Sequence, residues 1–301
     1  MKRDWRVAAL FAFAITVWGL NYPFVKEGVS LSSPLWFAVL RVLSGLIVSV
    51  ALLFVMKTKG QITRRQAASA FLLGIPGSAI FFGFWALAST EIPAGLVSVF
   101  IYTYPLWTLF LSIPILKDPP STKRLGAAFL GFFGVALTSQ LGFVSVPASE
   151  VGAIAELVAA GLGFAIMNVY FKKLFKGEQL IRANVWQLAG ASVVLALWAG
   201  FTTPVQGIQW NLDLLLVLIW VGAIGTAVVY VVFFTLMSKY SAASLTAYFF
   251  LVVVVALVSS YFISGETIDV LQAVGVGAIL VAIYLVGQSD RSKRKESPSS
   301  P

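Results

Sequence analysis

Ten apolar segments of roughly 18 to 26 residues follow one another along this chain, and about 20 such residues suffice to cross the ~30 Å hydrocarbon core of a bilayer. Apolar residues make up 59% of the 301-residue chain and charged residues 11%, which is too apolar for a soluble domain. We therefore predict an all-α integral membrane protein with ten transmembrane helices. They are expected at residues 7–25, 34–56, 67–88, 93–115, 124–141, 150–171, 184–201, 212–237, 242–263 and 270–287.

The basic residues alternate with these segments. All but two of the 21 lysines and arginines lie before the first segment or after an even-numbered one. Cytoplasmic loops of membrane proteins are enriched in Lys and Arg, so the alternation predicts a multi-pass protein of the cell membrane with both termini in the cytoplasm. The two exceptions, Lys26 and Arg41, are candidates for function.

The composition also excludes several kinds of site. The chain has no cysteine and no histidine, so we expect no disulfide, no transition-metal site and no cofactor. The lack of histidine, and of two aspartates in facing spans, argues against a membrane enzyme. The net charge of +9 lies in short loops beside the spans, where anionic lipid explains it without a nucleic-acid partner. The predicted partners are the lipid bilayer and a small-molecule substrate.

The two halves of the chain resemble each other. Gly74-Ile-Pro-Gly77 matches Gly222-Ala-Ile-Gly225, and Asn21 matches Asn168. The match of Gly45 with Gly190 places Trp186 opposite Arg41. We predict a first five-helix repeat over residues 1–143, a second over 144–288, and a disordered cytoplasmic tail over 289–301.

Because each repeat holds an odd number of helices, the second repeat must be inverted relative to the first. Inverted repeats are characteristic of secondary transporters, whose two halves exchange conformations around a site near the membrane midplane. This arrangement predicts transport by alternating access.

Several short motifs are similar to those of the drug/metabolite transporter superfamily and its ten-helix EamA-like exporters. They are Trp18-Gly19-Leu20-Asn21, Arg41, Tyr104-Pro105 with Gly126, and Gly265-Glu266 followed by Gly275. The resemblance covers residues 5 to 288 and implies two five-helix repeats and export or exchange of small metabolites, often amino acids. Two positions depart from it. Val254 stands where the second repeat would match Pro105, which predicts a straighter ninth helix, and Lys117 stands opposite Glu266.

Three charged residues need an explanation. Arg41 lies well inside the second span, where a charge is costly, and both a substrate-carboxylate contact and a structural tie stay open for it. Glu156 is the acid furthest inside a span, and it is a candidate for binding an amine, carrying a proton or pairing with Arg41. Lys26 ends the first helix and is expected to form a solvated ion pair with Glu27.

Aromatic and amide side chains near the helix breaks complete the candidate substrate site, because a buried amide or phenol needs a hydrogen-bonding partner. Besides Arg41 and Glu156, the predicted substrate-binding residues are Trp18, Asn21, Tyr22, Phe82, Trp85, Tyr102, Asn168, Tyr230 and Tyr248. The fifth and tenth helices are nearly free of polar groups and carry small residues at a spacing of four. They are expected to be scaffold or dimer contacts, in a monomer or a homodimer.

The leading hypothesis is therefore a secondary transporter that exports a small, partly apolar metabolite such as an amino acid. An exchanger of phosphate-sugars or nucleotide-sugars is an alternative, although a dianionic phosphate should require more than one basic group. A receptor that binds without flux is an alternative of another class.

Overall fold

A computed structural model describes residues 5–92, 94–118, 120–138, 150–205, 207–264 and 268–296 of the chain. These residues form helices, turns and loops without a β-strand. The first half comprises α1 (Trp5–Leu31), α2 (Pro34–Val55), α3 (Arg64–Gly74), the π-helix η1 (Ile75–Ile80), α4 (Phe81–Glu91), α5 (Ala94–Ile101), α6 (Tyr104–Leu116) and α7 (Thr122–Thr138). The second half comprises α8 (Val151–Leu174), α9 (Gln179–Thr202), α10 (Leu212–Leu218), the π-helix η3 (Ile219–Val228), α11 (Val229–Lys239), α12 (Ala242–Tyr248), α13 (Leu251–Ser264) and α14 (Val270–Glu296).

These elements confirm the all-helical membrane fold. In the described part of the chain, nine helical segments are long and apolar enough to cross a membrane. The remaining predicted span corresponds to α7, whose 17 described residues extend over about 26 Å at 1.5 Å per residue. Residues 139–149, in which the predicted boundary between the repeats falls, lie outside the described residues.

Local sequence signals set several helix starts. Thr63 and Gln66 form a reciprocal capping box that opens α3. Pro34 occupies the first turn of α2, where a missing N–H is harmless. At the other end of the chain, α14 continues to Glu296, past the predicted end of the last repeat at 288. Two hydrogen bonds hold this extension: Ser289 bonds to Ser121, just before α7, and Asp290 accepts from Ser244 of α12.

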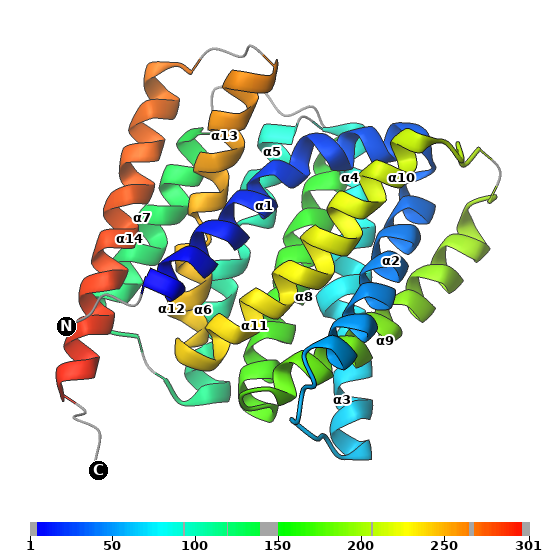
Figure 1. The fold of residues 1–301 in the computed structure, drawn as a ribbon. Coiled ribbons are helices and arrows are strands. Elements are labelled where there is room, and N and C mark those ends of the chain that lie inside the picture. The colour runs from blue at the N-terminus through cyan, green and yellow to red at the C-terminus, as the bar shows by residue number, and fades with distance from the viewer. Residues whose placement is uncertain are drawn as a thin grey trace.

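The two halves repeat one pattern of elements. In each, a long first segment is followed by a second, then by a segment interrupted by a π-helix, a segment interrupted by a turn, and a last helix. The contacts repeat as well, because α4 packs on α8 as α11 packs on α1, and α6 packs on α8 as α13 packs on α1. The start of α1 and the end of α14 lie toward the lower left of the bundle (Figure 1), which we call the terminal end, and the opposite end is the distal end.

The ninth segment corrects one expectation from the sequence. It was expected to be straighter than the fourth because Val254 replaces a proline, yet a turn at Phe249 and Phe250 separates α12 from α13. The equivalent turn at Tyr102 and Thr103 separates α5 from α6. The expectation is wrong because the break does not depend on proline; backbone bonds of the tighter i→i+3 kind close both turns.

The last helices of the halves form a separate pair. α7 and α14 pack closely along one edge of the bundle (Figure 1). A Cβ atom at Gly134 would lie 2.7 Å from the carbonyl oxygen of Gly275, and one at Gly275 would lie 2.6 Å from that of Gly134. The two glycines therefore allow the backbones to touch, as small residues do in membrane helices.

Candidate functional site

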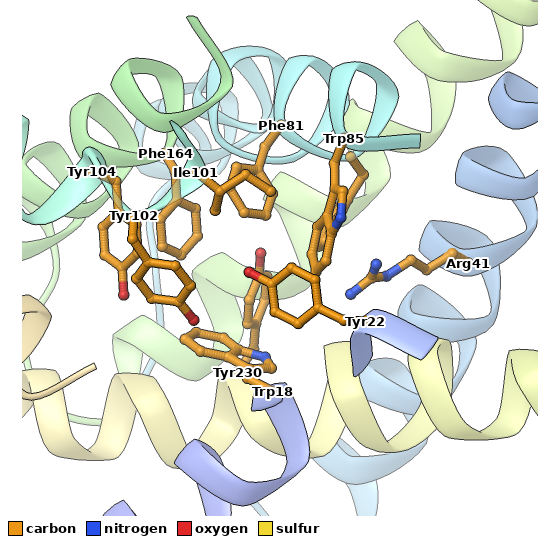
Figure 2. Close-up of a pocket in the computed structure, with 11 residues that line it drawn as sticks. Trp18, Tyr22, Arg41, Phe81, Trp85, Ile101, Tyr102, Tyr104, Phe164 and Tyr230 are labelled. Atoms are coloured by element: carbon orange, nitrogen blue, oxygen red, sulfur yellow. The ribbon is translucent and has the colours of Figure 1, made fainter. Parts of the chain in front are cut away.

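A narrow cavity lies in the middle of the bundle, away from the α7–α14 pair. Figure 2 shows the side chains around it, which are aromatic except for one arginine and one isoleucine. The lining residues are Trp18, Tyr22, Arg41, Phe81, Phe82, Trp85, Ile101, Tyr102, Tyr104, Phe164 and Tyr230. The first half contributes most of this wall through α1, α2, α4 and the break between α5 and α6, and the second half contributes Phe164 of α8 and Tyr230 of α11.

Arg41 is the charged group of this lining. Its side chain enters from α2 and points between Tyr22 and Trp85 (Figure 2). The guanidinium carbon lies 4.2 Å from the ring centre of Phe82 and 4.8 Å from that of Trp85, so both rings attract the cation.

Arg41 has no counter-charge among the residues that the structure describes. Its Nε donates a long hydrogen bond of 3.4 Å to the hydroxyl of Thr226 in η3. Among the described residues no carboxylate lies within 4 Å of it. A buried charge without a partner is destabilising, which makes Arg41 the feature of this cavity most in need of an anion.

The equivalent position in the other half carries Gln187, and not Trp186 as the sequence match suggested. The carbonyl oxygen of Arg41 approaches Gly222, and that of Gln187 approaches the equivalent Gly74. Thr226 follows Gly222 by four residues and accepts a hydrogen bond from Arg41. Ser78 follows Gly74 by four residues and donates a hydrogen bond of 2.9 Å to Gln187. Trp186 is instead 45% exposed.

Trp18 links the first helix to the π-helix of the second half. Its indole N–H donates to the carbonyl oxygen of Gly225 at 2.9 Å. A Cβ atom at Gly225 would lie 2.8 Å from the side-chain amide of Asn21, so glycine is what allows α1 to approach η3. This contact fixes Trp18 against the cavity beside Phe249, whose ring centre is 4.9 Å away.

The cavity is narrow. It offers about 30 Å³ to the centre of a water molecule, which is room for two or three waters. Tyr22, Tyr102, Tyr104 and Tyr230 bring phenol groups to it. The hydroxyl of Tyr104 is buried without a hydrogen-bond partner in the described part of the chain. A larger ligand would enter only if aromatic side chains moved apart.

Toward the terminal end the cavity is sealed. Trp18, Phe233 and Phe249 pack together beneath it, and Phe11, Tyr240 and Tyr248 pack below them. A polar cluster lies nearer the loops. In it, the carboxylate of Asp290 accepts hydrogen bonds from Arg124 at 2.8 Å, Ser244 at 2.7 Å and Tyr248 at 3.3 Å, which ties α7, α12 and α14 together.

The structure brings together most of the residues that the sequence singled out. Those in the cavity wall are Trp18, Tyr22, Arg41, Phe82, Trp85, Tyr102 and Tyr230. The other four lie elsewhere. Asn21 and Asn168 are buried, and their amide groups have no hydrogen-bond partner within the described ranges. Glu156 is half-exposed on α8 and belongs neither to the cavity nor to an ion pair with Arg41. Tyr248 belongs to the Asp290 cluster.

Sequence reasoning did not select four lining residues: Phe81, Ile101, Tyr104 and Phe164. Phe164 lies one helical turn before Asn168 and stacks on Phe81 with ring centres 4.8 Å apart. The signal that could have found it is its i, i+4 relation to a buried amide on a packed helix. Phe81 and Tyr104 adjoin selected residues in the sequence, and Ile101 carries no polar group that would single it out.

Lys26 also differs from expectation. The described residues show no ion pair between it and Glu27 within 4 Å. Adjacent residues on a helix point in different directions, so the expected pair is wrong. The described part of the chain likewise shows no cluster of His, Cys, Asp or Glu side chains that could hold a metal ion.

Comparison with protein families gives two matches along the chain. The model of the EamA-like transporter family matches residues 5–140 and again residues 152–288. The chain belongs to the EamA-like transporter family. It is therefore a multi-pass membrane protein of a transporter family, as the resemblance of its motifs predicted.

Individual relatives agree with this assignment. The chain is 29% identical to the uncharacterized transporter YvbV of Bacillus subtilis (strain 168), over 96% of this chain and 94% of the relative. It is 26% identical to a probable amino-acid metabolite efflux pump of Salmonella typhimurium (strain LT2), over 92% and 93%. A protein of known crystal structure shares the fold with a TM-score of 0.74 over 95% of this chain and 99% of that one, at 13% identity.

Proposed function

We propose that this protein exports a small carboxylate with an apolar body, such as an apolar amino acid, by alternating access of its two inverted halves. The two halves are proposed to be residues 1–143 and 144–288, and both termini are proposed to lie in the cytoplasm, where the basic loops belong. The cavity lies between elements of both halves, which is where a transporter of this design binds its substrate.

The observation that carries the proposal is the unpaired guanidinium of Arg41. Arginine presents several N–H donors in a planar fork that matches a carboxylate. The protein supplies one acceptor, the hydroxyl of Thr226. A substrate carboxylate would give the buried charge its partner and would be held tightly because the surroundings are apolar.

The rest of the lining fits the body of such a substrate. Beyond Arg41, the wall consists of rings and one aliphatic chain, with Tyr102 and Tyr104 on the far side of the cavity (Figure 2). Aromatic faces attract an ammonium group, so a zwitterionic amino acid is accommodated as well as a simple acid. Among the described residues no aspartate or glutamate lines the cavity, and a substrate carrying only positive charge would be repelled by Arg41.

The same lining disfavours the phosphate alternative. A phosphate-sugar carries two negative charges, and sites for such groups combine several basic donors. Of the described residues in this cavity wall, Arg41 is the single cation. The name of the Salmonella relative, a probable amino-acid metabolite efflux pump, also supports the amino-acid form of the proposal.

Transport by purified protein in proteoliposomes tests this function. We expect uptake of radiolabelled L-leucine, L-phenylalanine or 3-phenylpropionate, and loss of that uptake in Arg41→Gln. The control is Arg65→Gln, which removes the same charge from an exposed position on α3. If the wild-type protein moves none of the three probes, or if Arg41→Gln moves them as well as Arg65→Gln does, the proposed function is wrong.

A further inference from the structure

A second, smaller hollow adjoins the cavity on its distal side. Its lining residues are Tyr22, Lys26, Trp85, Ser89, Ile92 and Val97. Two of them, Tyr22 and Trp85, also line the main cavity. Their ring centres are 5.4 Å apart, so this pair of rings is the partition between the two spaces.

The helices on either side of the partition repeat one spacing. On α1, Lys26 follows Tyr22 by four residues, and on α4, Ser89 follows Trp85 by four. Residues four apart share a helix face and are separated by about 6 Å along the axis. Each helix therefore places one ring in the partition and one polar side chain a turn further out.

The lysine in the outer hollow suits an anion. Lys26 is exposed and has no carboxylate within 4 Å among the described residues. The hydroxyl of Ser89 donates to the carbonyl oxygen of Trp85 at 2.7 Å, which holds the side chain at the wall. The apolar remainder of the lining, Ile92 and Val97, would contact the body of a ligand.

The two positive charges thus lie at adjoining hollows. Lys26 is at the outer hollow and Arg41 is at the inner cavity, and both spaces border Tyr22 and Trp85. A charged group beside a hollow raises the local concentration of ligands of opposite charge. Neither basic residue belongs to the loops that explain the other lysines and arginines.

We propose that the outer hollow is a second binding site for the substrate's carboxylate, with Lys26 as its charge, and that the substrate crosses between Lys26 and Arg41 when Tyr22 and Trp85 move apart. This inference rests on the proposed function, because it assigns the same carboxylate to both sites. It adds a second binding site on the distal side, which molecules arriving from the terminal side reach only after Arg41.

Initial uptake rates of the anion 3-phenylpropionate in intact cells and in everted vesicles, with vector-only membranes subtracted, test this site. Removing one exposed charge costs ~1 kcal/mol or less. Lys26→Gln should therefore raise KM by about 3- to 5-fold for uptake from the distal face of the membrane, and leave kcat unchanged. Lys26→Arg should keep the wild-type KM. The control Lys176→Gln removes an exposed lysine at the terminal end and should not change the KM for uptake from the distal face.

The dependence of KM on ionic strength distinguishes electrostatic attraction of the substrate by Lys26 from a structural role of Lys26. The attraction of an exposed charge is screened within about 3 Å at 1 M salt but reaches about 30 Å at 0.01 M. The wild-type KM should therefore rise with added salt, and the KM of Lys26→Gln should not. An unchanged KM in Lys26→Gln, an equal rise from both faces, or an undiminished salt dependence would overturn the outer site. Loss of uptake in Arg41→Gln would still support the inner site, so the two proposals fail separately.

Discussion

Arg41 and Gln187 occupy equivalent positions in the two halves, yet their side chains differ in hydrogen bonding. Gln187 donates to Asn184 at 2.9 Å and accepts from Ser78 at 2.9 Å, so both ends of its amide are paired. Arg41 makes one long bond to Thr226 and otherwise faces aromatic rings. The half that carries the neutral side chain satisfies it internally, and the half that carries the charge leaves it unpaired.

This difference shows how a repeated scaffold acquires a single site. The π-helices, the glycines at the helix crossings and the turns that break the fourth and ninth segments occur in both halves. The cavity forms on the Arg41 side, where α1, α2 and α4 meet Phe164 and Tyr230. The repeat explains the arrangement of helices that both halves share, and the difference between Arg41 and Gln187 explains the carboxylate binding that we propose.

The largest expected effect comes from replacing Arg41 with glutamine, the residue at the equivalent position of the other half. Arg41→Gln should lower kcat/KM for a carboxylate by about 30-fold or more, because truncating one partner of a buried charge pair costs ~2 to 5 kcal/mol. Its melting temperature should not fall, since the variant removes an unpaired buried charge. Uptake assays and thermal unfolding in detergent measure both. A variant that unfolds at lower temperature would indicate that Arg41 is a structural tie.

The next effect concerns the helix crossings beside these two residues. A Cβ atom at Gly74 would meet the backbone oxygen of Gln187, whereas one at Gly222 would meet the side chain of Ser44 and, at 2.9 Å, the oxygen of Arg41. Gly74→Ala should therefore destabilise more than Gly222→Ala, each by about 1 to 3 kcal/mol through overpacking. Melting temperatures give the order, with Gly126→Ala as the control because its site is open. The reverse order would contradict the geometry.

A smaller effect should separate the hydroxyls that meet the two residues. Thr226→Val removes the acceptor of Arg41 and should lower carboxylate uptake by about 5-fold, the equivalent of ~1 kcal/mol for a hydrogen bond. Ser78→Ala leaves the oxygen of Gln187 without its donor and should lower the melting temperature with little change in uptake. If both variants affect uptake equally, the contrast between the halves has no functional meaning.

The smallest effect is expected at Glu156. Its carboxylate is half-exposed and outside the cavity, so Glu156→Gln should keep the wild-type uptake rate with and without an imposed pH gradient. A lost response to the gradient would make Glu156 a proton carrier after all. The measurement uses the same proteoliposomes, with internal and external pH set independently.

Much of this structure follows from patterns of known physical origin. The transmembrane helices could be predicted because the length of the apolar segments follows from the thickness of the bilayer. The repeat could be predicted because glycines recur where helices pack closely. Arg41, Trp18, Tyr22 and Trp85 could be singled out because polar or amphipathic groups near helix breaks need partners. The same reasoning also selected Asn21 and Asn168, because burial without a partner does not tell whether a side chain faces a cavity.

The remaining features depend on contacts between distant segments. The break at Phe249 has no proline to signal it. The equivalence of Arg41 with Gln187 differs by one residue from the sequence match and emerges only from the crossings at Gly74 and Gly222. A shift of one residue turns a helix position by about 100°, which is the difference between an exposed tryptophan and a buried glutamine.

Ligand-induced stabilisation tests most directly whether Arg41 binds a carboxylate. A ligand that binds the folded protein raises its melting temperature. Wild-type protein in detergent should be stabilised by L-phenylalanine and not by L-phenylalaninamide, which lacks the carboxylate, and Arg41→Gln should respond to neither. Equal stabilisation of Arg41→Gln and wild type by L-phenylalanine would contradict the account.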